Sequence, residues 1–274
     1  MNTGTKFRLV QSPALNGPEN MARDEALLES VGSNESEPVL RLYRWHPPTL
    51  SLGYSQPVED VDRTALIQRG WGLVRRPTGG RAILHSDELT YAVILPLSHP
   101  LAAGGVLASY QKLISGLTRA LELLGLTVVI EKEKGLDGES RRNPVCFENP
   151  SAYELTVQGK KLIGSAQVRR QHAMLQHGTL PLSGDLGRIC DVLQFDSQNA
   201  RERARMRLES QAGTVQLLLG HEVSWSQANR AIQQGFKRAF DLQLAESQPT
   251  EGEQQRMQEL VRARYANPTW TERL

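Results

Sequence analysis

The sequence predicts a globular protein of the α/β class, with one large domain or one domain and a small appendage. Two observations carry this prediction. Apolar runs typical of strands alternate with segments of helical period along the 274 residues. Hydrophobic residues make up 39% of the chain and charged residues 23%, an ordinary globular composition with enough apolar side chains for a substantial core.

The charge balance and the cysteine content exclude several classes of protein. The chain carries 32 Lys and Arg residues against 30 Asp and Glu, so it lacks the positive excess of a dedicated nucleic-acid binder. The N-terminal sequence has no continuous apolar segment typical of a signal peptide, and no run of about 18 apolar residues predicts a membrane span. We therefore expect a cytoplasmic protein. Its two cysteines, Cys146 and Cys190, fit a reducing compartment and exclude a disulfide framework and a Cys-rich zinc site.

The first half of the chain predicts a helix, a series of strands and a second helix. Pro18 suits the first turn of a helix, and Met21 and Leu28 follow at helical spacing. Apolar, β-rich runs then predict strands over 39–45, 49–54, 71–76, 82–85 and 89–97. The clearest helix of the chain spans 106–124, and Gly125 stands where a glycine favours helix termination.

The second half predicts a β-meander followed by helices. A strand over 127–131 leads into a charged, glycine-containing loop at 132–144. The stretch 152–182 then alternates as strand, Gln-Gly turn, strand and a further strand, which predicts the meander. Three helical segments follow: one over 185–193 with Cys190 on its apolar face, one that begins at the capping box of Ser224, and one after the polar stretch 247–253.

A glycine pair between two predicted strands is the first candidate for a binding site. Gly79 and Gly80 lack Cβ atoms, so a ligand can approach their backbone N–H groups closely. The spacing fits neither the GxxxxGK[ST] phosphate loop nor the GxGxxG dinucleotide motif, so it predicts no nucleotide site. The alternative is a tight turn between strands with Arg75 and Arg76 in solvent.

Cys146 and Lys161 are the candidates for chemistry. Arg141 and Arg142 precede Cys146, and positive charge nearby favours the thiolate; the alternative is a buried, inert cysteine, which is the interpretation we favour for Cys190. Lys160 and Lys161 are adjacent in a predicted strand, so their side chains face opposite sides. An inward Lys161 needs acceptors and indicates a site for a carbonyl or carboxylate, whereas the alternative is an exposed hairpin tip.

Four motifs occur in order along the chain: RRPTGGRAILHSDELTY at 75–91, VCFENPSAYEL, GKKLIGSAQ and LQHGTLPL. Together they closely resemble the lipoate and biotin protein ligase superfamily, and the resemblance extends from NMARDEALL near residue 20 to RYANPTW near the end. Within it, the chain is similar to octanoyltransferases of the LipM type. Arg81 stands where ATP-dependent ligases usually have a third glycine, and Cys146 lies in the CFxxPSxYEL context. HSDELTY departs from the usual HDQELTY, which shifts the acidic residue by one position.

The resemblance implies a mixed β-sheet with surrounding helices, with residues 1–247 as the catalytic domain and 248–274 as a helical tail packed on it. It implies that Lys161 hydrogen-bonds the acyl carbonyl. The implied substrate-binding residues are Arg75, Arg76, Thr78, Gly79, Gly80, Arg81, His85, Gly164, Ser165, Ala166, His177 and Gly178. The histidines are either proton carriers or hydrogen-bonded core residues, and we favour the second interpretation for His177. An apolar slot for the acyl chain is expected along Leu73, Val74, Ile83 and Leu84.

The implied reaction is transfer of an octanoyl group from octanoyl-acyl carrier protein, through a thioester on Cys146, to a lysine of a lipoyl-accepting protein. The expected acceptor is the glycine cleavage H protein, and a dehydrogenase E2 subunit offers the same type of lysine. Exchange between thioesters is nearly isoenergetic and amide formation from a thioester is downhill, so no ATP is expected. We also expect no cofactor or metal, and neither a nucleic acid nor a membrane as partner. Four arginines are candidate contacts for acidic partner proteins, and the alternative is that they are exposed to solvent: Arg141, Arg142, Arg169 and Arg170.

Three functions stay open at this point. The first is the cysteine acyltransferase, with a lipoyl amidotransferase as a variant of it. The second is an ATP-dependent lipoate-protein ligase in which Cys146 is incidental, although the chain after residue 247 is too short for the accessory domain found in many such ligases. The third is a binding module without catalysis. Replacement of Cys146 separates them, because only the first depends on its thiol.

Overall fold

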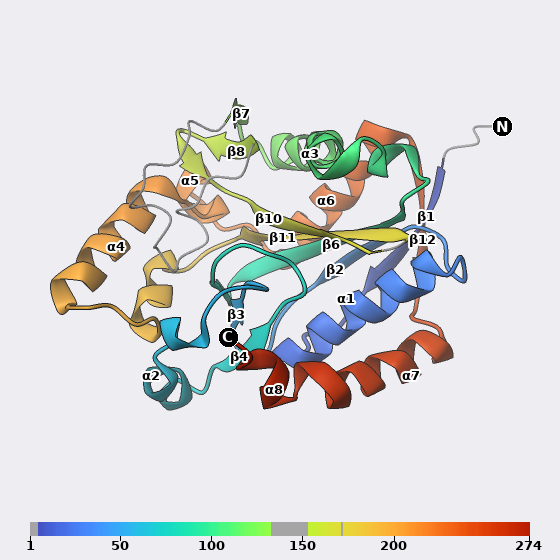
Figure 1. The fold of residues 1–274 in the computed structure, drawn as a ribbon. Coiled ribbons are helices and arrows are strands. Elements are labelled where there is room, and N and C mark those ends of the chain that lie inside the picture. Colours follow the sequence, from blue (N-terminus) through green and yellow to red (C-terminus); the bar gives the residue numbers. More distant parts are fainter. Residues whose placement is uncertain (1–4, 133–152, 171) are drawn as a thin grey trace.

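The computed structural model describes residues 5–132, 153–170 and 172–274, and its centre is a six-stranded sheet (Figure 1). The strand order is β10 (Gly164–Arg169), β11 (Ala173–Pro181), β6 (Glu88–Pro96), β2 (Val39–Tyr43), β1 (Thr5–Gln11) and β12 (Leu242–Ser247). β12, β1 and β2 run parallel, whereas β2, β6, β11 and β10 are antiparallel neighbours. The sheet is therefore mixed, as predicted.

Helices cover both faces of this sheet. α1 (Gly17–Gly32) and α7 (Glu251–Leu260) lie on one face, and α3 (Gly105–Leu123) and α6 (Trp225–Phe240) lie on the other (Figure 1). The central strand β6 contributes to a hydrophobic core on each face of the sheet, because successive side chains of a strand point to opposite faces. Tyr91, Val93 and Leu95 pack in the core with α3 and α6, whereas Ala92 and Ile94 pack in the core with α1.

A small sheet beside the main one carries the glycine loop. β3 (Thr49–Leu52) pairs in parallel with β4 (Gly72–Arg75) and antiparallel with β5 (Ile83–His85). Three segments complete a third core around it: α2 (Arg63–Gln68), the 3₁₀ segment Leu186–Val192 and α4 (Gln198–Gln211). Cys190 is fully buried in this core, which confirms its structural interpretation. The short helix predicted over 185–193 is thus present as a 3₁₀ segment.

The predicted β-meander is wrong, because its strands belong to two sheets. β8 (Tyr153–Val157) and β9 (Lys160–Lys161) form a hairpin with β7 (Val129–Lys132), around a turn whose Gln158 and Gly159 have φ of 53° and 74°. The chain then passes through the buried residues Leu162 and Ile163 and continues as β10 in the main sheet. The predicted second strand is therefore two strands, and it connects Lys161 to the edge of the main sheet.

The remaining segments complete the layers. α5 (Val215–Leu219) follows α4, and after α7 the chain forms a π-helical turn at Val261–Tyr265 and the short α8 (Pro268–Thr271). Leu260 and Tyr265 pack in the core with α1. No helix in the described ranges is long and apolar enough to cross a membrane. Cys146, Arg141, Arg142 and nearly all of the predicted loop at 132–144 lie outside the described residues.

Candidate active site

The glycine loop between β4 and β5 is held from within by Arg76. Its guanidinium donates to the carbonyl oxygens of Gly79 and Arg81 at 2.9 and 2.7 Å and to that of Ser51 at 2.9 Å. Only 2% of Arg76 is exposed, so the alternative of a turn with solvated arginines does not hold. The loop also presses against Gly53, where a Cβ atom would lie 1.8 Å from the Gly80 carbonyl oxygen. Position 53 therefore needs glycine for this close approach.

Beneath this loop lies a cavity whose empty space, open solvent included, is about 360 Å³. It brings together seven of the predicted site residues: Arg76, His85, Gly164, Ser165, Ala166, His177 and Gly178. Met21, Tyr43, Trp45, Ile83, Thr90 and Thr179 complete the lining. The wall thus combines apolar and aromatic side chains with polar groups that are already hydrogen-bonded to one another.

Other predicted site residues lie outside this lining. Gly79 and Gly80 are exposed on the loop, Arg81 is half-buried beside them, and Thr78 is buried behind them. Arg75 is fully buried, and its guanidinium donates to the backbone carbonyls of Thr271 and Gly53 at 2.7 and 2.9 Å. These contacts hold Arg75 in the interior, outside the cavity lining.

The apolar slot also differs from its prediction. Of the four residues expected along it, Ile83 lines the cavity, whereas Val74 packs against α1 and the remaining two, Leu73 and Leu84, pack into the core beneath the small sheet. Neighbours along a strand face opposite sides, so they cannot all line one cavity. Met21, Tyr43 and Trp45 supply the rest of the apolar wall, from α1 and from the end of β2.

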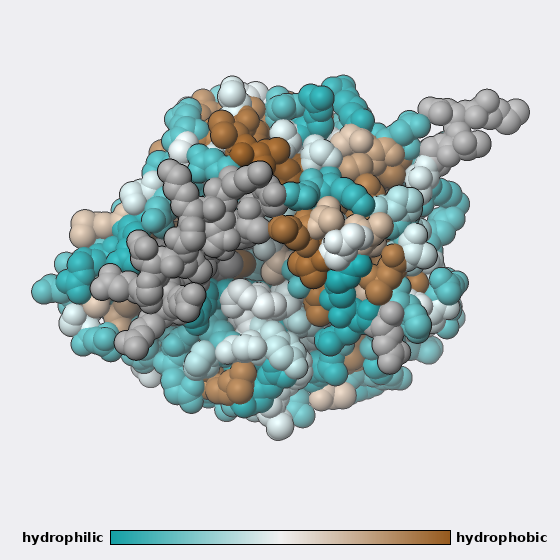
Figure 2. All heavy atoms as spheres, turned by 45° about the horizontal axis from the view of Figure 1, so that its top comes forward, coloured by the Kyte–Doolittle hydropathy of each residue, from teal (hydrophilic) through white to brown (hydrophobic). Residues whose placement is uncertain are grey.

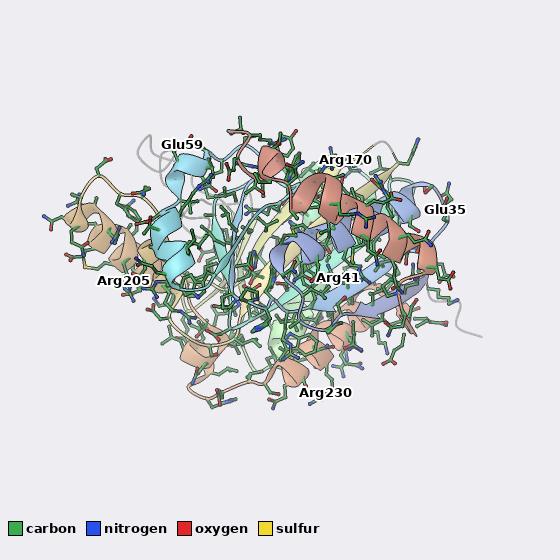
Figure 3. All side chains as sticks on the ribbon, turned by 90° about the horizontal axis from the view of Figure 1, so that it is seen from below. Glu35, Arg41, Glu59, Arg170, Arg205 and Arg230 are labelled. Carbon is green, nitrogen blue, oxygen red and sulfur yellow. The ribbon has the colours of Figure 1, made fainter. Side chains whose placement is uncertain are left out.

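His177 belongs to a buried hydrogen-bonded network that extends to α1. Its Nε2 atom lies 2.7 Å from the Thr78 hydroxyl, and its Nδ1 atom lies 3.1 Å from the Asp24 carboxylate. Asp24 also accepts from Arg41 at 2.6 Å and from the Tyr43 hydroxyl at 2.9 Å, and Arg41 is fully buried and lies near the middle of the view in Figure 3. Burial alone raises the pKa of the Asp24 carboxyl, but the Arg41 charge and the bond from His177 hold that pKa below its ordinary value.

The charge state of His177 follows from this network. Burial lowers its pKa even though the Asp24 carboxylate opposes this shift, so the imidazole is neutral at neutral pH. Nδ1 faces an ionised carboxylate and therefore carries the proton, while Nε2 accepts from the Thr78 hydroxyl. Both nitrogens have partners, in agreement with the interpretation of His177 as a hydrogen-bonded core histidine.

His85 forms a similar network, which Ser51 links to Arg76. Its Nδ1 donates to Glu88 at 2.7 Å, and its Nε2 lies 2.8 Å from the Ser51 hydroxyl. The Glu88 carboxylate also accepts from the hydroxyls of Thr90 and Thr179. The imidazole stacks on Trp45 with ring centroids 4.0 Å apart and an interplanar angle of 10°. His85 is thus a fixed part of the cavity wall.

Sequence reasoning missed three acidic or hydroxyl partners in these networks: Asp24, Glu88 and Ser51. A signal for Asp24 was present, because it lies between Met21 and Leu28 on the buried side of α1. A carboxylate on an apolar helix face needs a buried partner. Ser51 gave no such signal, because its contact with His85 depends on the pairing of β3 with β5.

Lys161 faces inward and Lys160 outward, as the strand alternation predicted. Lys161 is 5% exposed and its Nζ atom lies 2.7 Å from the Glu154 carboxylate, so it is not an exposed hairpin tip. Lys160 instead donates to the Glu209 and Ser210 carbonyl oxygens at the end of α4. The inward lysine therefore lies beside a carboxylate, three residues before the cavity residue Gly164.

The cavity wall on this side depends on a second close approach. The Ser165 hydroxyl lies 2.7 Å from the Tyr91 hydroxyl, directly beside Gly178 on the neighbouring strand. A Cβ atom at position 178 would lie 2.6 Å from the Gly164 carbonyl oxygen and 2.7 Å from the Tyr91 ring. Gly178 thus lets β10 and the tyrosine close the wall of the cavity.

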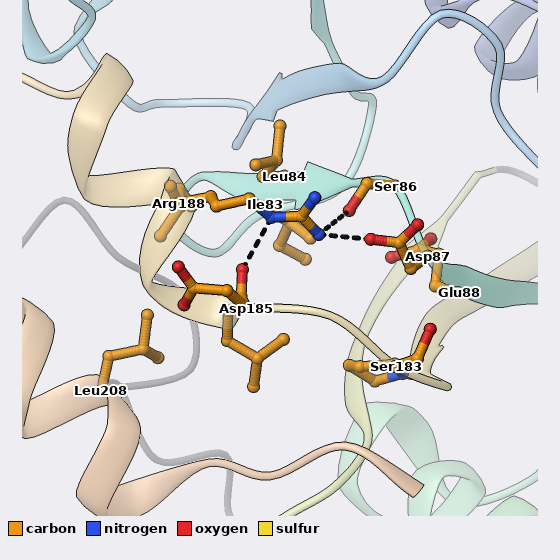
Figure 4. Close-up of a pocket in the computed structure, with 12 residues that line it drawn as sticks. Ile83, Leu84, Ser86, Asp87, Glu88, Ser183, Asp185, Arg188 and Leu208 are labelled. Atoms are coloured by element: carbon orange, nitrogen blue, oxygen red, sulfur yellow. Dashed lines mark hydrogen bonds and ion pairs between the residues drawn. The ribbon is translucent and has the colours of Figure 1, made fainter. Parts of the chain in front are cut away.

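A second hollow, with about 460 Å³ of empty space, lies near β5 and shares Ile83 with the first cavity (Figure 4). Arg188 donates to the Asp185 carbonyl at 2.9 Å and to the Ser86 hydroxyl at 3.1 Å, and it forms an ion pair with Asp87. The displaced acidic residue of HSDELTY therefore pairs with Arg188. Since the cavity below the glycine loop is lined by seven of the predicted site residues, we take that one as the candidate active site.

Comparisons with known proteins show the family to which the chain belongs. The model of the lipoyl protein ligase A/B catalytic domain matches residues 16–237. Octanoyltransferase LipM of Carboxydothermus hydrogenoformans is 40% identical over 265 residues, which cover 96% of this chain and 97% of the relative. Octanoyltransferase LipM of Symbiobacterium thermophilum is 39% identical, over 98% of this chain and 99% of the relative.

The fold has a counterpart among solved structures. A bipartite lipoate protein ligase of Thermoplasma acidophilum superposes with a TM-score of 0.79 at 24% identity, over 98% of this chain and 96% of that one. At this identity the likeness concerns the fold alone. On the family match and the full-length relatives, the chain belongs to the family of the lipoyl protein ligase A/B catalytic domain, and within it to the LipM octanoyltransferases, which are acyltransferases.

Proposed function

We propose that this enzyme transfers an octanoyl group from octanoyl-acyl carrier protein to a lysine of a lipoyl-accepting protein in lipoate biosynthesis. The observation that carries the proposal is the cavity beneath the glycine loop, whose polar groups are already engaged with one another. The names of the full-length relatives support octanoyl as the transferred group. We infer that the acceptor is the glycine cleavage H protein, with an E2 lipoyl domain as the other candidate.

The acyl chain occupies the cavity and the carbonyl lies toward Lys161. Burial of a methylene contributes about 0.8 kcal/mol, so the six methylenes of an octanoyl group contribute roughly 5 kcal/mol to binding. Met21, Trp45 and Ile83 provide apolar contacts for it. This energy comes from apolar area, so the site measures chain length without a charged contact to the chain.

Lys161 stabilises the oxygen of the reacting carbonyl in this proposal. The lysine is buried and lies 2.7 Å from Glu154, which fixes its position. A donor placed at a developing oxyanion in a dry site is worth about 3 kcal/mol of transition-state stabilisation. Glu154 thereby acts as a positioning residue for Lys161.

Cys146 is the proposed nucleophile. Its thiolate forms a new carbon–sulfur bond with the acyl carbon while the thiolate of the carrier leaves. The neutral acceptor amine then attacks this thioester, an amide bond forms, the Cys146 thiolate leaves, and the proton that the amine nitrogen loses passes to that thiolate or to solvent. The two half-reactions share one covalent intermediate, so ping-pong kinetics are expected. Neither step needs ATP, because a thioester is already activated.

The test is the intact mass of the protein after mixing with octanoyl-acyl carrier protein in the absence of ATP. A hydroxylamine-labile octanoyl adduct is expected on the wild-type protein and on Cys190→Ala, and none on Cys146→Ala. Cys190 is the matched control because it is buried in the core beneath the small sheet. An adduct that persists in Cys146→Ala refutes the nucleophile. Acceptor modification that requires ATP and free octanoate makes the protein a ligase.

A further inference from the structure

The lining of the cavity beneath the glycine loop, which we call the acyl cavity, crosses four neighbouring strands of the main sheet. Four of its lining residues pair directly across these strands: Gly164 with Thr179, Thr179 with Thr90, and Thr90 with Tyr43. Three strand spacings, together roughly 14 Å, separate the first residue of this row from the last. Lys161 precedes Gly164 by three residues, so the row leads from the strand that follows the lysine to the end of β2.

Trp45 lies at the β2 end of this row. It comes two residues after Tyr43, the last residue of β2, and it lines the cavity while only 6% of it is exposed. Exposed hydrophobic residues form separate patches among hydrophilic ones in Figure 2, whereas Trp45 is a buried part of the wall. In the proposed reaction the acyl carbonyl lies toward Lys161, so the methyl end of the chain lies toward Trp45. The position of the indole ring therefore limits the length of the chain that fits.

The indole of Trp45 is held both at its edge and on its face. Its Nε1 atom donates to the Thr90 hydroxyl at 2.8 Å, and the His85 ring stacks on it with ring centroids 4.0 Å apart. Both partners donate in turn to one atom, the Oε1 oxygen of Glu88: His85 through Nδ1 at 2.7 Å, and Thr90 through its hydroxyl. Because the Thr90 hydrogen points at Glu88, a lone pair of the same hydroxyl is left for the indole N–H. The two contacts that fix the ring thus depend on a single carboxylate oxygen.

Glu88 itself is not among the residues that line the acyl cavity. It is 5% exposed, it begins β6, and it belongs to the lining of the second hollow, where Figure 4 shows it beside Asp87. Its second oxygen accepts from the Thr179 hydroxyl. An effect of Glu88 on the acyl chain therefore passes through the residues that it holds.

We propose that Glu88 is a positioning residue that determines which acyl chain length the enzyme accepts. Its carboxylate holds the Thr90 hydroxyl and the His85 ring, and these two hold Trp45 as the wall at the methyl end. Without the carboxylate, both partners lose their shared buried acceptor, the indole ring is free to turn, and the cavity lengthens. This inference rests on the proposed function and deepens it, because it names what selects the acyl group.

The experiment offers the enzyme octanoyl- and decanoyl-acyl carrier protein at equal concentrations, with the glycine cleavage H protein as acceptor. Mass spectrometry of the acceptor gives the ratio of octanoyl to decanoyl transferred. Glu88→Met removes both acceptor oxygens and keeps an unbranched side chain of similar length. Glu88→Gln is the conservative variant, because its amide oxygen still accepts from His85 and Thr90 while its amide N–H donates to the Thr179 hydroxyl.

The matched control is Glu253→Met, which removes a carboxylate of similar burial from another part of the molecule. Glu253 is 3% exposed and pairs with Arg8 at 2.6 Å, between α7 and β1. It is not among the residues that line the acyl cavity. This variant should lose stability without a change in chain-length preference, so it separates the proposed effect from a general loss of stability.

For Glu88→Met, the ratio of octanoyl to decanoyl transferred should fall several-fold, up to about 15-fold, which is about four-fold for each of the two added methylenes. Glu88→Gln and Glu253→Met should keep the wild-type ratio. An unchanged ratio in Glu88→Met overturns the proposal, and so does an equal fall in either of the other two variants. A wild-type enzyme that transfers both groups equally well overturns it too.

A double variant tests whether the effect passes through the indole ring. Glu88→Met should leave the ratio of Trp45→Phe unchanged, whereas independent effects on the two positions would multiply and overturn the proposal. If Glu88→Met does not fold, Thr90→Val takes its place, because valine offers no acceptor to the Trp45 Nε1 atom. The same fall is expected there, and an unchanged ratio refutes the role of Glu88. A wild-type enzyme that transfers neither group would instead refute the proposed function.

Discussion

Removal of the buried charge of Asp24 tests the network that joins α1 to the cavity. Asp24→Asn keeps the size of the side chain but leaves the Arg41 guanidinium without an ionic partner. Both side chains are fully buried, and their atoms are 2.6 Å apart. Breaking such a pair costs about 3–5 kcal/mol. Arg41 keeps neutral acceptors on Asn20 at 2.7 and 3.0 Å, so we expect a loss near 3 kcal/mol.

The assay is urea unfolding followed by circular dichroism. The midpoint should fall with an unchanged slope, and the melting temperature should drop by roughly 5–10 °C. Glu29→Gln is the matched control, because Glu29 pairs with Arg256 at 2.6 Å but both side chains are exposed. That pair should contribute at most about 1 kcal/mol. If Asp24→Asn loses no more stability than Glu29→Gln, the argument from burial is refuted.

Three further predictions concern pH, the glycine loop and chain length. The pKa of Asp24 is lowered in the folded protein, so the ionised carboxylate contributes to the free energy of unfolding at pH values above its ordinary unfolded pKa near 4. That contribution is lost as the pH falls through the folded pKa, so the difference in stability between wild type and Asp24→Asn should narrow from pH 7 to pH 3. A constant difference would contradict this assignment. Gly53→Ala places a Cβ atom 1.8 Å from the Gly80 carbonyl oxygen, so kcat/KM for acyl transfer should fall on the order of 100-fold. Gly32→Ala is the control, because a Cβ atom there makes only ordinary contacts and activity should be retained. Equal effects of the two variants would count against the close approach at Gly53. Trp45→Phe enlarges the acyl cavity, so the preference measured in a competition assay should shift toward longer acyl donors, by up to about four-fold per added methylene. An unchanged preference would show that Trp45 does not limit the length of the acyl chain.

Local patterns predicted the elements that have a strong period. The helix over 106–124 and the capping box at Ser224 correspond to α3 and α6, because each buries one apolar stripe. Strand alternation predicted that Lys160 and Lys161 face opposite sides, and the structure shows that Lys161 is the buried one. In contrast, α4 buries only Ala204 and Leu208 along its length, so its sequence carries almost no apolar period and no helix was predicted there.

Contacts between distant segments explain the other differences. The strands β1 and β12 were not predicted; they pair with each other across the length of the chain, from Thr5 with Leu242 onward. Arg75 and Arg76 look alike in the sequence, yet the first donates to the backbone of Thr271 and the second to the glycine loop. No local pattern distinguishes these two partners, because the carbonyl of Thr271 approaches Arg75 only after the C-terminal segment has packed.

The two histidine networks also limit where the chemistry can occur. His177 and His85 each have a carboxylate at Nδ1 and a hydroxyl at Nε2, from Thr78 and Ser51 respectively. Because each Nδ1 donates to its carboxylate, each hydroxyl must donate its hydrogen to Nε2. Thr78 lies in the glycine loop, and Ser51 also accepts from Arg76, whose guanidinium donates to that loop, so both histidines are linked to the loop by hydrogen bonds. A histidine whose two nitrogens are engaged in this way serves better as a positioning residue than as a proton carrier. The proposed chemistry therefore falls to Lys161, which Glu154 positions, and to the cysteine nucleophile.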